Sequence, residues 1–426
     1  MFLWVLHVVA MRRRSSSFSN FRVVLQSKDY YNLDADIKSA VLKISSSVVS
    51  ITTRTGENML FVGSGTIIEY DQQGFATVLT SATLVRGPDG ATLIPADLKI
   101  EVYLSDGKFY EGQVSFCDFH YNIATIKIKA TTSLSTATFR YIDDSVTVDL
   151  RESVLVKHST HLKLRPGDRV IALGRDCVDH HEVMASPGVF SAYDCRHDCK
   201  ELFLTTCVVT KLAVGGPLIN SNGEVIGVNF FICPFNVFIP INIVAKCLED
   251  VKRNRQVARP WLGVQIANLY TADLEKLDKL YQEFPNVSGG VIIEQVVGKG
   301  NMGSRMRTKA NHWTSLPVRN WFKAKALHEN DRKRKRIKFI TDKGDRTISR
   351  IKEWQRSSPA SVSGLWAGDV IIKCGDVSVD SHLKFVEALW DKEGKLLELV
   401  LLRPGSGEQT VTLTVGSFPE MPGWYL

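Results

Sequence analysis

Short apolar runs separated by turn signals dominate residues 40 to 245 of the chain. The runs are rich in β-branched and aromatic residues, and turn signals such as "DQQG", "SDG", "RPGD" and "SNG" lie between them. Many short strands without long intervening helices are typical of an all-β sandwich or barrel. The runs that we expect to form strands are "SVVSITT", "LFVGSGTIIEY", "FATVLTSATLV", "LKIEVYL", "NIATIKIKA", "DRVIALG", "GVFSAYD", "LFLTTCVV" and "EVIGVNFF".

A second, smaller unit follows the helix-like "INIVAKCLEDVKRN" and the linker-like "RQVARP". Five or six short strands and the amphipathic "HLKFVEALW" predict a small mixed α/β domain. We see no internal repeat. The patterns divide the chain into an N-terminal tail (1–39), a β-rich domain (40–250), a linker (251–258), the mixed domain (259–416) and a C-terminal tail (417–426).

Charge is concentrated in one insert of the second unit, at about residues 298–351. The chain has 426 residues and a net charge of +8, but residues 298–356 hold 18 Lys or Arg against 5 Asp or Glu. This segment is therefore +13 and the rest of the chain −5. The run "DRKRKRIK" is a candidate nuclear-localisation or nucleic-acid patch. We favour a solvated insertion or unspliced sequence, so we do not expect a nucleic-acid partner.

The first residues and the cysteines bear on the compartment. The apolar run in "MFLWVLHVVAMRRRSSSFSN" is too short to span a membrane, and the Arg- and Ser-rich stretch after it has no acid before Asp29. It is either transit-peptide-like or a disordered tail. Eight cysteines in 426 residues are too few for a disulfide scaffold and favour a reducing compartment. We expect an intracellular protein, with organelle import or the nucleus as open alternatives.

Five motifs follow one another along the chain: "GSGTIIE", "VLTSATLV", "NIATIKI", "GDRVIALG" and "AVGGPLINSNGEVIGVNFF". In their wording and order they resemble motifs of the HtrA/Deg (protease Do-like) family, and the resemblance covers about residues 40 to 415, apart from the insert. The resemblance implies an all-β trypsin-like double β-barrel followed by a small mixed α/β PDZ-like domain. It also implies serine endopeptidase activity in proteolysis or protein quality control.

The catalytic residues of that family are missing from the matching positions. The histidine falls on Thr83, the aspartate on Asn122 and the serine on Val214. Thr83 has no basic nitrogen, Asn122 carries no negative charge, and Val214 cannot attack a carbonyl. The triad is therefore degenerate at all three positions.

The loop before the nucleophile position has changed too. Leu212 and Ala213 replace a Gly-Asn pair, which puts the oxyanion hole in doubt. Gly215 and Gly216 survive, and a turn needed for folding would explain them. A relocated triad using His120 and Ser81 would still need a nucleophile at the glycine turn, so we expect His120 to be a surface or loop histidine.

Two clusters of Cys, His and Asp have spacings that a metal could use: "RDCVDHHE" (175–182) and "YDCRHDC" (193–199). The strand-like segment between them would hold them about 30 Å apart, and neither has paired CxxC spacing. We interpret both as polar loops and expect no metal and no cofactor.

The stretch Trp261, Leu262, Gly263 and Val264 ("WLGV") matches the loop that holds a peptide's C-terminal carboxylate in PDZ domains. The alternative is that Trp261 and Leu262 pack between the domains. We expect a catalytically silenced family member that binds peptides or protein C-termini and forms homo- or hetero-oligomers with active relatives. The alternative is an active serine endopeptidase.

Overall fold

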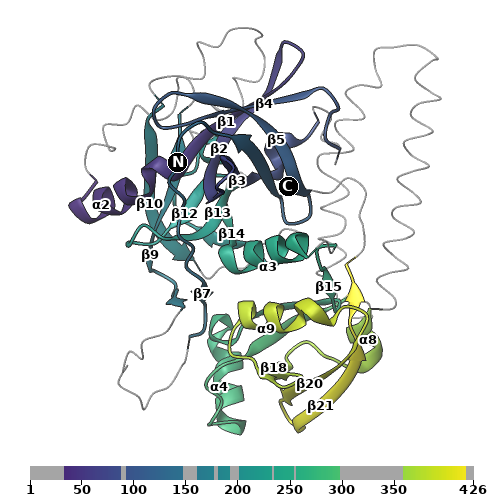
Figure 1. Cartoon of the computed structure of the whole chain (residues 1–426). Coiled ribbons are helices and arrows are strands. Elements are labelled where there is room, and N and C mark those ends of the chain that lie inside the picture. Colours follow the sequence, from purple (N-terminus) through teal and green to yellow (C-terminus); the bar gives the residue numbers. More distant parts are fainter. Residues whose placement is uncertain are drawn as a thin grey trace, which may run out of the picture.

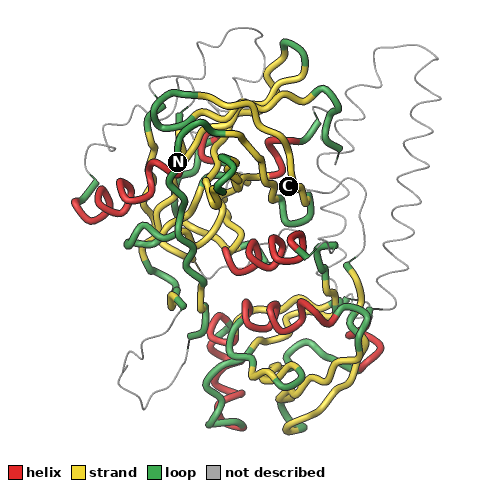
Figure 2. Tube along the Cα trace, in the orientation of Figure 1, coloured by secondary structure: helices red, strands yellow, loops and turns green. Residues whose placement is uncertain are grey.

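The computed structural model describes residues 33–87, 93–146, 161–176, 181–191, 201–232, 235–253, 256–297 and 358–418. Strands are the main regular structure in these residues, and the helices are short (Figure 2). The basic insert and the cluster at 193–199 lie outside the described residues, as do most of both tails. No helix among the described residues is long and apolar enough to cross a membrane.

The first barrel is a closed ring of six antiparallel strands in the order β1-β2-β3-β6-β5-β4. Its apolar core includes Ile51, Val78 and Ile126, none of which is exposed. The strands are β1 (Val48–Thr55), β2 (Asn58–Tyr70), β3 (Phe75–Ser81), β4 (Leu98–Tyr103), β5 (Phe109–Asp118) and β6 (Ile123–Lys129).

The second barrel closes in the order β10-β11-β14-β13-β12-β9. The short parallel pair β7 (Ile142–Asp143) and β8 (Leu162–Lys163) lies outside it. The barrel strands are β9 (Arg169–Arg175), β10 (Val183–Ser191), β11 (Phe203–Thr205), β12 (Pro217–Ile219), β13 (Val225–Ile232) and β14 (Phe235–Pro240). The predicted trypsin-like double β-barrel is thus confirmed.

Two helices flank the barrels. Helix α2 (Ala35–Ile44) begins at Asp34, whose side chain accepts the Ile37 N–H, and buries Ile37 and Ile44 in the core that it shares with the second barrel. It straddles residue 39, where the sequence pattern placed the end of the tail. Helix α3 (Ile241–Lys252) forms where the sequence predicted a helix.

In the part that the structure describes, the C-terminal β-rich domain contains a sheet in the order β16-β17-β18-β20-β21 and three α-helices. Its other pair, β15 with β22, joins the start of the domain to its end. Figure 1 shows α9 lying between this sheet and α3. The elements are β15 (Pro260–Trp261), β16 (Val264–Asn268), α4 (Leu274–Glu283), β17 (Val291–Val296), α8 (Pro359–Ser363), β18 (Val370–Cys374), β19 (Val377–Ser378), α9 (His382–Leu389), β20 (Leu396–Arg403), β21 (Gly407–Thr414) and β22 (Gly416–Ser417).

One apolar cluster runs from the second barrel into the C-terminal domain. Leu383, Val386 and Trp390 belong to the same buried cluster as Ile243 and Val244 of α3. Because these α9-side residues recur at helical spacing, one face of α9 packs on the barrels. Phe385 and Leu389 on another face pack into the core of their own domain.

Some elements were missed by the sequence pattern. Strand β5 reads "FYEGQVSFCD", in which polar residues alternate with half-buried ones, so no apolar run marks it. Helix α4 reads "LEKLDKLYQE" and buries only Leu277 and Leu280. Strand β10 begins at Val183, five residues before the expected run, and passes through Pro187.

Candidate functional site

Thr83 and Asn122 are brought together at the edge of the first barrel. Thr83 lies in the 3-10 turn Ala82–Val85 after β3, and Asn122 lies directly before β6. The Asn122 Oδ1 accepts the Thr83 N–H at 2.9 Å, the Thr83 hydroxyl at 3.0 Å and the Ser81 hydroxyl at 3.1 Å. The structure therefore places these two sequence-predicted positions in direct contact.

The Thr83 and Asn122 contact is a neutral hydrogen-bond cluster. Asn122 is 1% exposed and has a backbone φ of 53°. A residue other than glycine rarely adopts that conformation unless its surroundings hold it there. The three hydrogen bonds that Thr83 and Ser81 donate to the Asn122 side chain do so. Hydroxyl and amide groups here can brace the turn, but they supply no base for proton abstraction near neutral pH.

Val214 lies directly after the 3-10 turn Lys211–Ala213, just before β12 of the second barrel. Its side chain packs against the apolar core of the first barrel. Its carbonyl accepts the N–H of Ser64 at 2.8 Å, and the Ser64 hydroxyl donates to the Leu212 carbonyl at 2.5 Å. Ser64 of β2 thus clamps the loop at two carbonyls.

The backbone N–H groups of this loop are used inside the protein. Ala213 donates to Thr210 at 3.0 Å and Val214 donates to Lys211 at 3.3 Å, both to carbonyl oxygens. An oxyanion hole needs such groups free to meet a developing negative charge. Because the Val214 N–H is engaged in the turn, the nucleophile position offers no free donor for such a charge in this conformation.

Gly215 has a backbone requirement that explains its presence without catalysis. Its φ is 81°, in the left-handed region, and a Cβ there would lie 2.3 Å from the Thr80 Oγ1 and 2.6 Å from the Ser64 carbonyl oxygen. Its N–H donates to the carbonyl of Asn229 on β13 at 2.9 Å. Only glycine fits this crossing between the two barrels.

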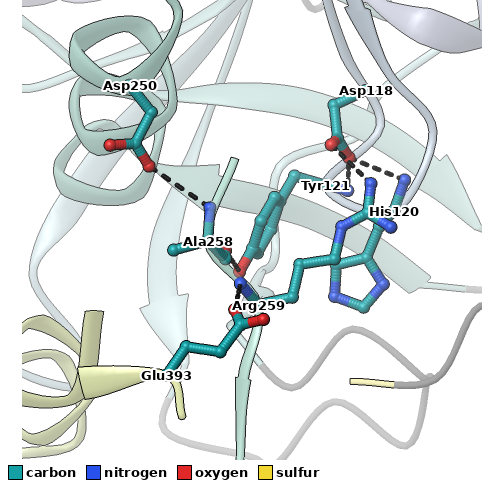
Figure 3. A network of polar contacts seen from close by, with 7 residues as sticks. All are labelled: Asp118, His120, Tyr121, Asp250, Ala258, Arg259 and Glu393. Carbon is teal, nitrogen blue, oxygen red and sulfur yellow. Dashed lines mark hydrogen bonds and ion pairs between the residues drawn. The ribbon is translucent and has the colours of Figure 1, made fainter. Parts of the chain in front are cut away.

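His120 is buried, which corrects the expectation of a surface histidine, although it does lie in a turn. It is 8% exposed, and its ring packs against the rings of Tyr121 and Phe418, with both centroids at 4.7 Å. The Asp118 Oδ1 accepts the N–H groups of His120 and Tyr121 at 2.8 and 2.9 Å (Figure 3). Because Asp118 fixes a turn here, His120 does not share a strand face with Asn122.

The turn that begins at Asp118 is tied to the linker between the domains (Figure 3). Arg259 donates from Nη2 to the Asp118 Oδ2 at 2.7 Å, and its N–H donates to Glu393 at 3.0 Å. The Asp250 Oδ2 accepts the Ala258 N–H at 3.2 Å and the Trp390 Nε1–H at 3.0 Å. The segment before Asn122 is therefore held by both domains.

No described cysteine can take over as a nucleophile near this site. Cys117, next to Asp118, has its pKa raised to about 12 by burial and by the neighbouring negative charge. Burial also raises the pKa of Cys207 and Cys247. The thiol form, which is the weak nucleophile, therefore dominates at neutral pH.

Of the two predicted metal-type clusters, only part of the first is described. Arg175 is buried and donates from Nε to the Val48 carbonyl at 2.5 Å, while the His181 ring stacks on Tyr103 at 5.3 Å. Within the described ranges, no three His, Cys, Asp or Glu side chains are grouped as a metal site would need.

The Trp261–Val264 loop begins the C-terminal domain. Leu262 is 3% exposed and belongs to the core of that domain, while Trp261 pairs with Gly416. Gly263 has a φ of 77°, and its carbonyl accepts the N–H of Val297 at 2.8 Å. In the part of the chain that the structure describes, no acceptor takes the N–H of Leu262 or Gly263.

The sequence is similar to proteins that are named as peptidases or proteases. Residues 63–228 match the family model of the trypsin-like peptidase domain. The chain is 31% identical to putative protease Do-like 14 of Arabidopsis thaliana over 279 residues, 61% of this chain and 58% of that protein. It is 25% identical to serine protease HTRA1 of Xenopus tropicalis over 369 residues, 83% of this chain and 59% of that protein.

A solved structure titled as the HtrA-type protease AlgW with decapeptide covers 90% of this chain and 99% of its own, with 18% identity and a TM-score of 0.46. The chain spans less than 60% of the length of the two curated relatives named above.

Proposed function

Because the chain belongs to the HtrA/Deg (protease Do-like) family, we propose that it is a catalytically silent member that acts by binding peptides or protein C-termini. The observation that carries the silent assignment is Val214. Its half-buried side chain packs against the core of the first barrel and its N–H is used in a turn, so the nucleophile position offers neither a reactive atom nor a free donor.

The other two catalytic positions support the same conclusion. Proton abstraction needs a base, and orientation of that base needs a charged partner. Thr83 and Asn122 instead form a neutral cluster with Ser81, which is fully buried. Removal of one triad member leaves only about 10³–10⁴-fold catalysis over water, and here all three differ.

Peptide binding is proposed for the Trp261–Val264 loop and the strand β16 that follows it. The PDZ-like reading needs backbone N–H groups for a terminal carboxylate and a strand edge for the peptide. Gly263 gives the loop its left-handed turn, and β16 is the terminal strand of its sheet. Helix α9 would form the second wall. Homo- or hetero-oligomers with active relatives would extend this role.

Serine endopeptidase activity is the second candidate, because one of the relatives is named a putative protease and the other a serine protease. It would require a nucleophile outside position 214. Ser81 is the serine in contact with the Asn122 position, but its hydroxyl donates to Asn122, and His120 lies in the ring cluster with Phe418.

The binding part is tested with pools of acetylated peptides that have randomised C-termini, in acid and amide forms. Hydrogen bonds to a charged group contribute about 1.5–3 kcal/mol, so the acid pool should bind the full chain about ten times more tightly or better. Equal binding of the two pools would contradict a carboxylate site in the Trp261–Val264 loop. The silent assignment has its own test, because it does not depend on peptide binding.

A further inference from the structure

Strand β16 and helix α9 would form the two walls of the proposed binding site, here called the peptide groove, and these walls are joined at one end. Asn268 is the last residue of β16 and His382 is the first of α9. The Asn268 Oδ1 accepts the His382 N–H at 2.6 Å. Because the Trp261–Val264 loop precedes β16, this bond lies at the end of the groove away from that loop.

Asp144, a residue of the first domain, reinforces this junction. It follows β7, and its Oδ2 accepts the Asn268 Nδ2–H at 2.8 Å while its Oδ1 accepts the Leu383 N–H at 3.3 Å. Its exposed fraction is 0%. One carboxylate from the barrel region therefore contacts both walls of the groove.

The backbone that carries Asp144 is held firmly on the barrels. The Asn242 side chain of α3 accepts the Ile142 N–H at 2.8 Å and donates to the Ile142 carbonyl at 3.0 Å. Beside Asp144, the ring of His382 lies 6.1 Å from the ring of Phe203 on β11. The end of the groove is thus built from residues of both domains.

We propose that Asp144 is a specificity-determining residue that, with Asn268, closes the far end of the peptide groove. The groove then accepts only a short free C-terminal segment. Strand β16 has 5 residues, which at ~3.3 Å per residue spans about 17 Å, enough for about four or five peptide residues. Asp144 acts through the walls that it holds, so it is a positioning residue. The inference rests on the proposed peptide binding.

The test uses the full chain and two peptide pools with free carboxylates: acetylated tetrapeptides randomised at all positions, and decapeptides that carry six further randomised residues before the same four. Isothermal titration gives the affinity for each pool. We expect the wild-type chain to bind tetrapeptides at least as tightly as decapeptides, because residues beyond the closed end make no contact.

Opening the end should change that preference. In Asp144→Ala the decapeptide pool should gain about tenfold over the tetrapeptide pool, because a longer peptide can add backbone hydrogen bonds along the edge. Asp143→Ala is the matched control, since the neighbouring side chain accepts only the Ser145 N–H at 3.0 Å among the described contacts. It should leave the preference unchanged.

If Asp144→Ala does not fold, Asp144→Asn is used instead. It keeps the volume of the Asp144 side chain but replaces one of the two accepting oxygens with an NH₂ group. Tighter decapeptide binding by the wild-type chain, or an unchanged preference in the folded variants, would overturn the closed end while leaving the carboxylate site intact. Binding of neither acid pool would contradict the proposed function, and this inference with it.

Discussion

The loops at Gly215 and Gly263 share a backbone device but treat their N–H groups in opposite ways. Both glycines have left-handed φ angles, 81° and 77°, and both lack room for a Cβ, which would meet another atom at 2.3 Å. The N–H groups of Ala213, Val214 and Gly215 donate to carbonyls within the protein. Those of Leu262 and Gly263 have no acceptor among the described residues.

The two loops share the features that serve folding and differ in whether their N–H groups are used inside the protein. Each loop anchors an apolar side chain, Val214 in the first barrel and Leu262 in the C-terminal domain. Anchoring and glycine geometry serve folding, so they persist in both. The use of the N–H groups is the feature that separates a loop serving the fold from a loop that can serve a ligand.

The largest expected effect is that of Gly215→Ala on stability. The new methyl group would combine a left-handed alanine with a clash against Thr80 and the Ser64 backbone, together about 3 kcal/mol or more. Urea unfolding of the barrels measures the loss. Gly56→Ala is the control, because Gly56 also has positive φ, at 55°, but nothing lies within 4 Å of a Cβ there; it should cost about 1 kcal/mol.

Gly263→Ala is the counterpart in the second loop. The clash there is with the Ser358 side chain of the same domain, so we expect loss of peptide binding with barrel unfolding unchanged. Unfolding of the barrels in Gly263→Ala, or a harmless Gly215→Ala, would break the contrast between the two loops.

The second effect concerns Arg259, which connects the segment before Asn122 with the linker before Trp261. Its partner Asp118 is nearly buried, with side-chain exposures of 21% for Arg259 and 4% for Asp118. Arg259→Ala should lower the free energy of unfolding by about 2 kcal/mol. Arg253 forms an ion pair with Glu249 that is 3.9 Å long, with side-chain exposures of 57% and 50%, so Arg253→Ala should change the free energy of unfolding by less than about 0.5 kcal/mol. Similar losses in both variants would show that the linker is not fixed by Asp118.

A smaller effect is the pH dependence that Asp144 contributes. Burial raises its pKa above the ordinary 3.8, although the contacts with Asn268 and Ser381 oppose the shift. The folded state then holds this proton more tightly than the unfolded chain, so between about pH 4 and the raised pKa stability falls as pH rises. Asp144→Asn should remove that slope and leave a constant offset from the lost acceptor. Denaturant unfolding at several pH values measures the slope. If stability changes with pH in the same way in the wild-type chain and in Asp144→Asn, Asp144 does not have a raised pKa in the folded state.

The smallest expected effect is that of Val214→Ser, which should restore no measurable hydrolysis, because the new hydroxyl would have no base. Only Val214→Ser with Thr83→His and Asn122→Asp, helped by Leu212→Gly and Ala213→Asn, supplies the parts of a triad and its loop. Casein turnover by the single variant would show that a base already lies within reach of position 214.

The sequence predicted the barrels because short apolar runs rich in β-branched residues are separated by turn signals, and the motif order aligned Thr83, Asn122 and Val214. It could not predict that Ser64 clamps the loop, since that bond joins residues 148 positions apart. His120 looked polar and therefore exposed, but the Asp118 turn and Phe418 bury it. Asp144 gave no signal, because its partners lie in another domain.

The most direct test of the silent assignment is incubation of the purified, unmodified chain with unfolded casein and with a serine-directed fluorophosphonate probe. We predict neither cleavage nor covalent labelling above a heat-denatured control. Cleavage or labelling that disappears in Ser81→Ala, or in a substitution of another named residue, would reveal a relocated nucleophile and contradict the assignment.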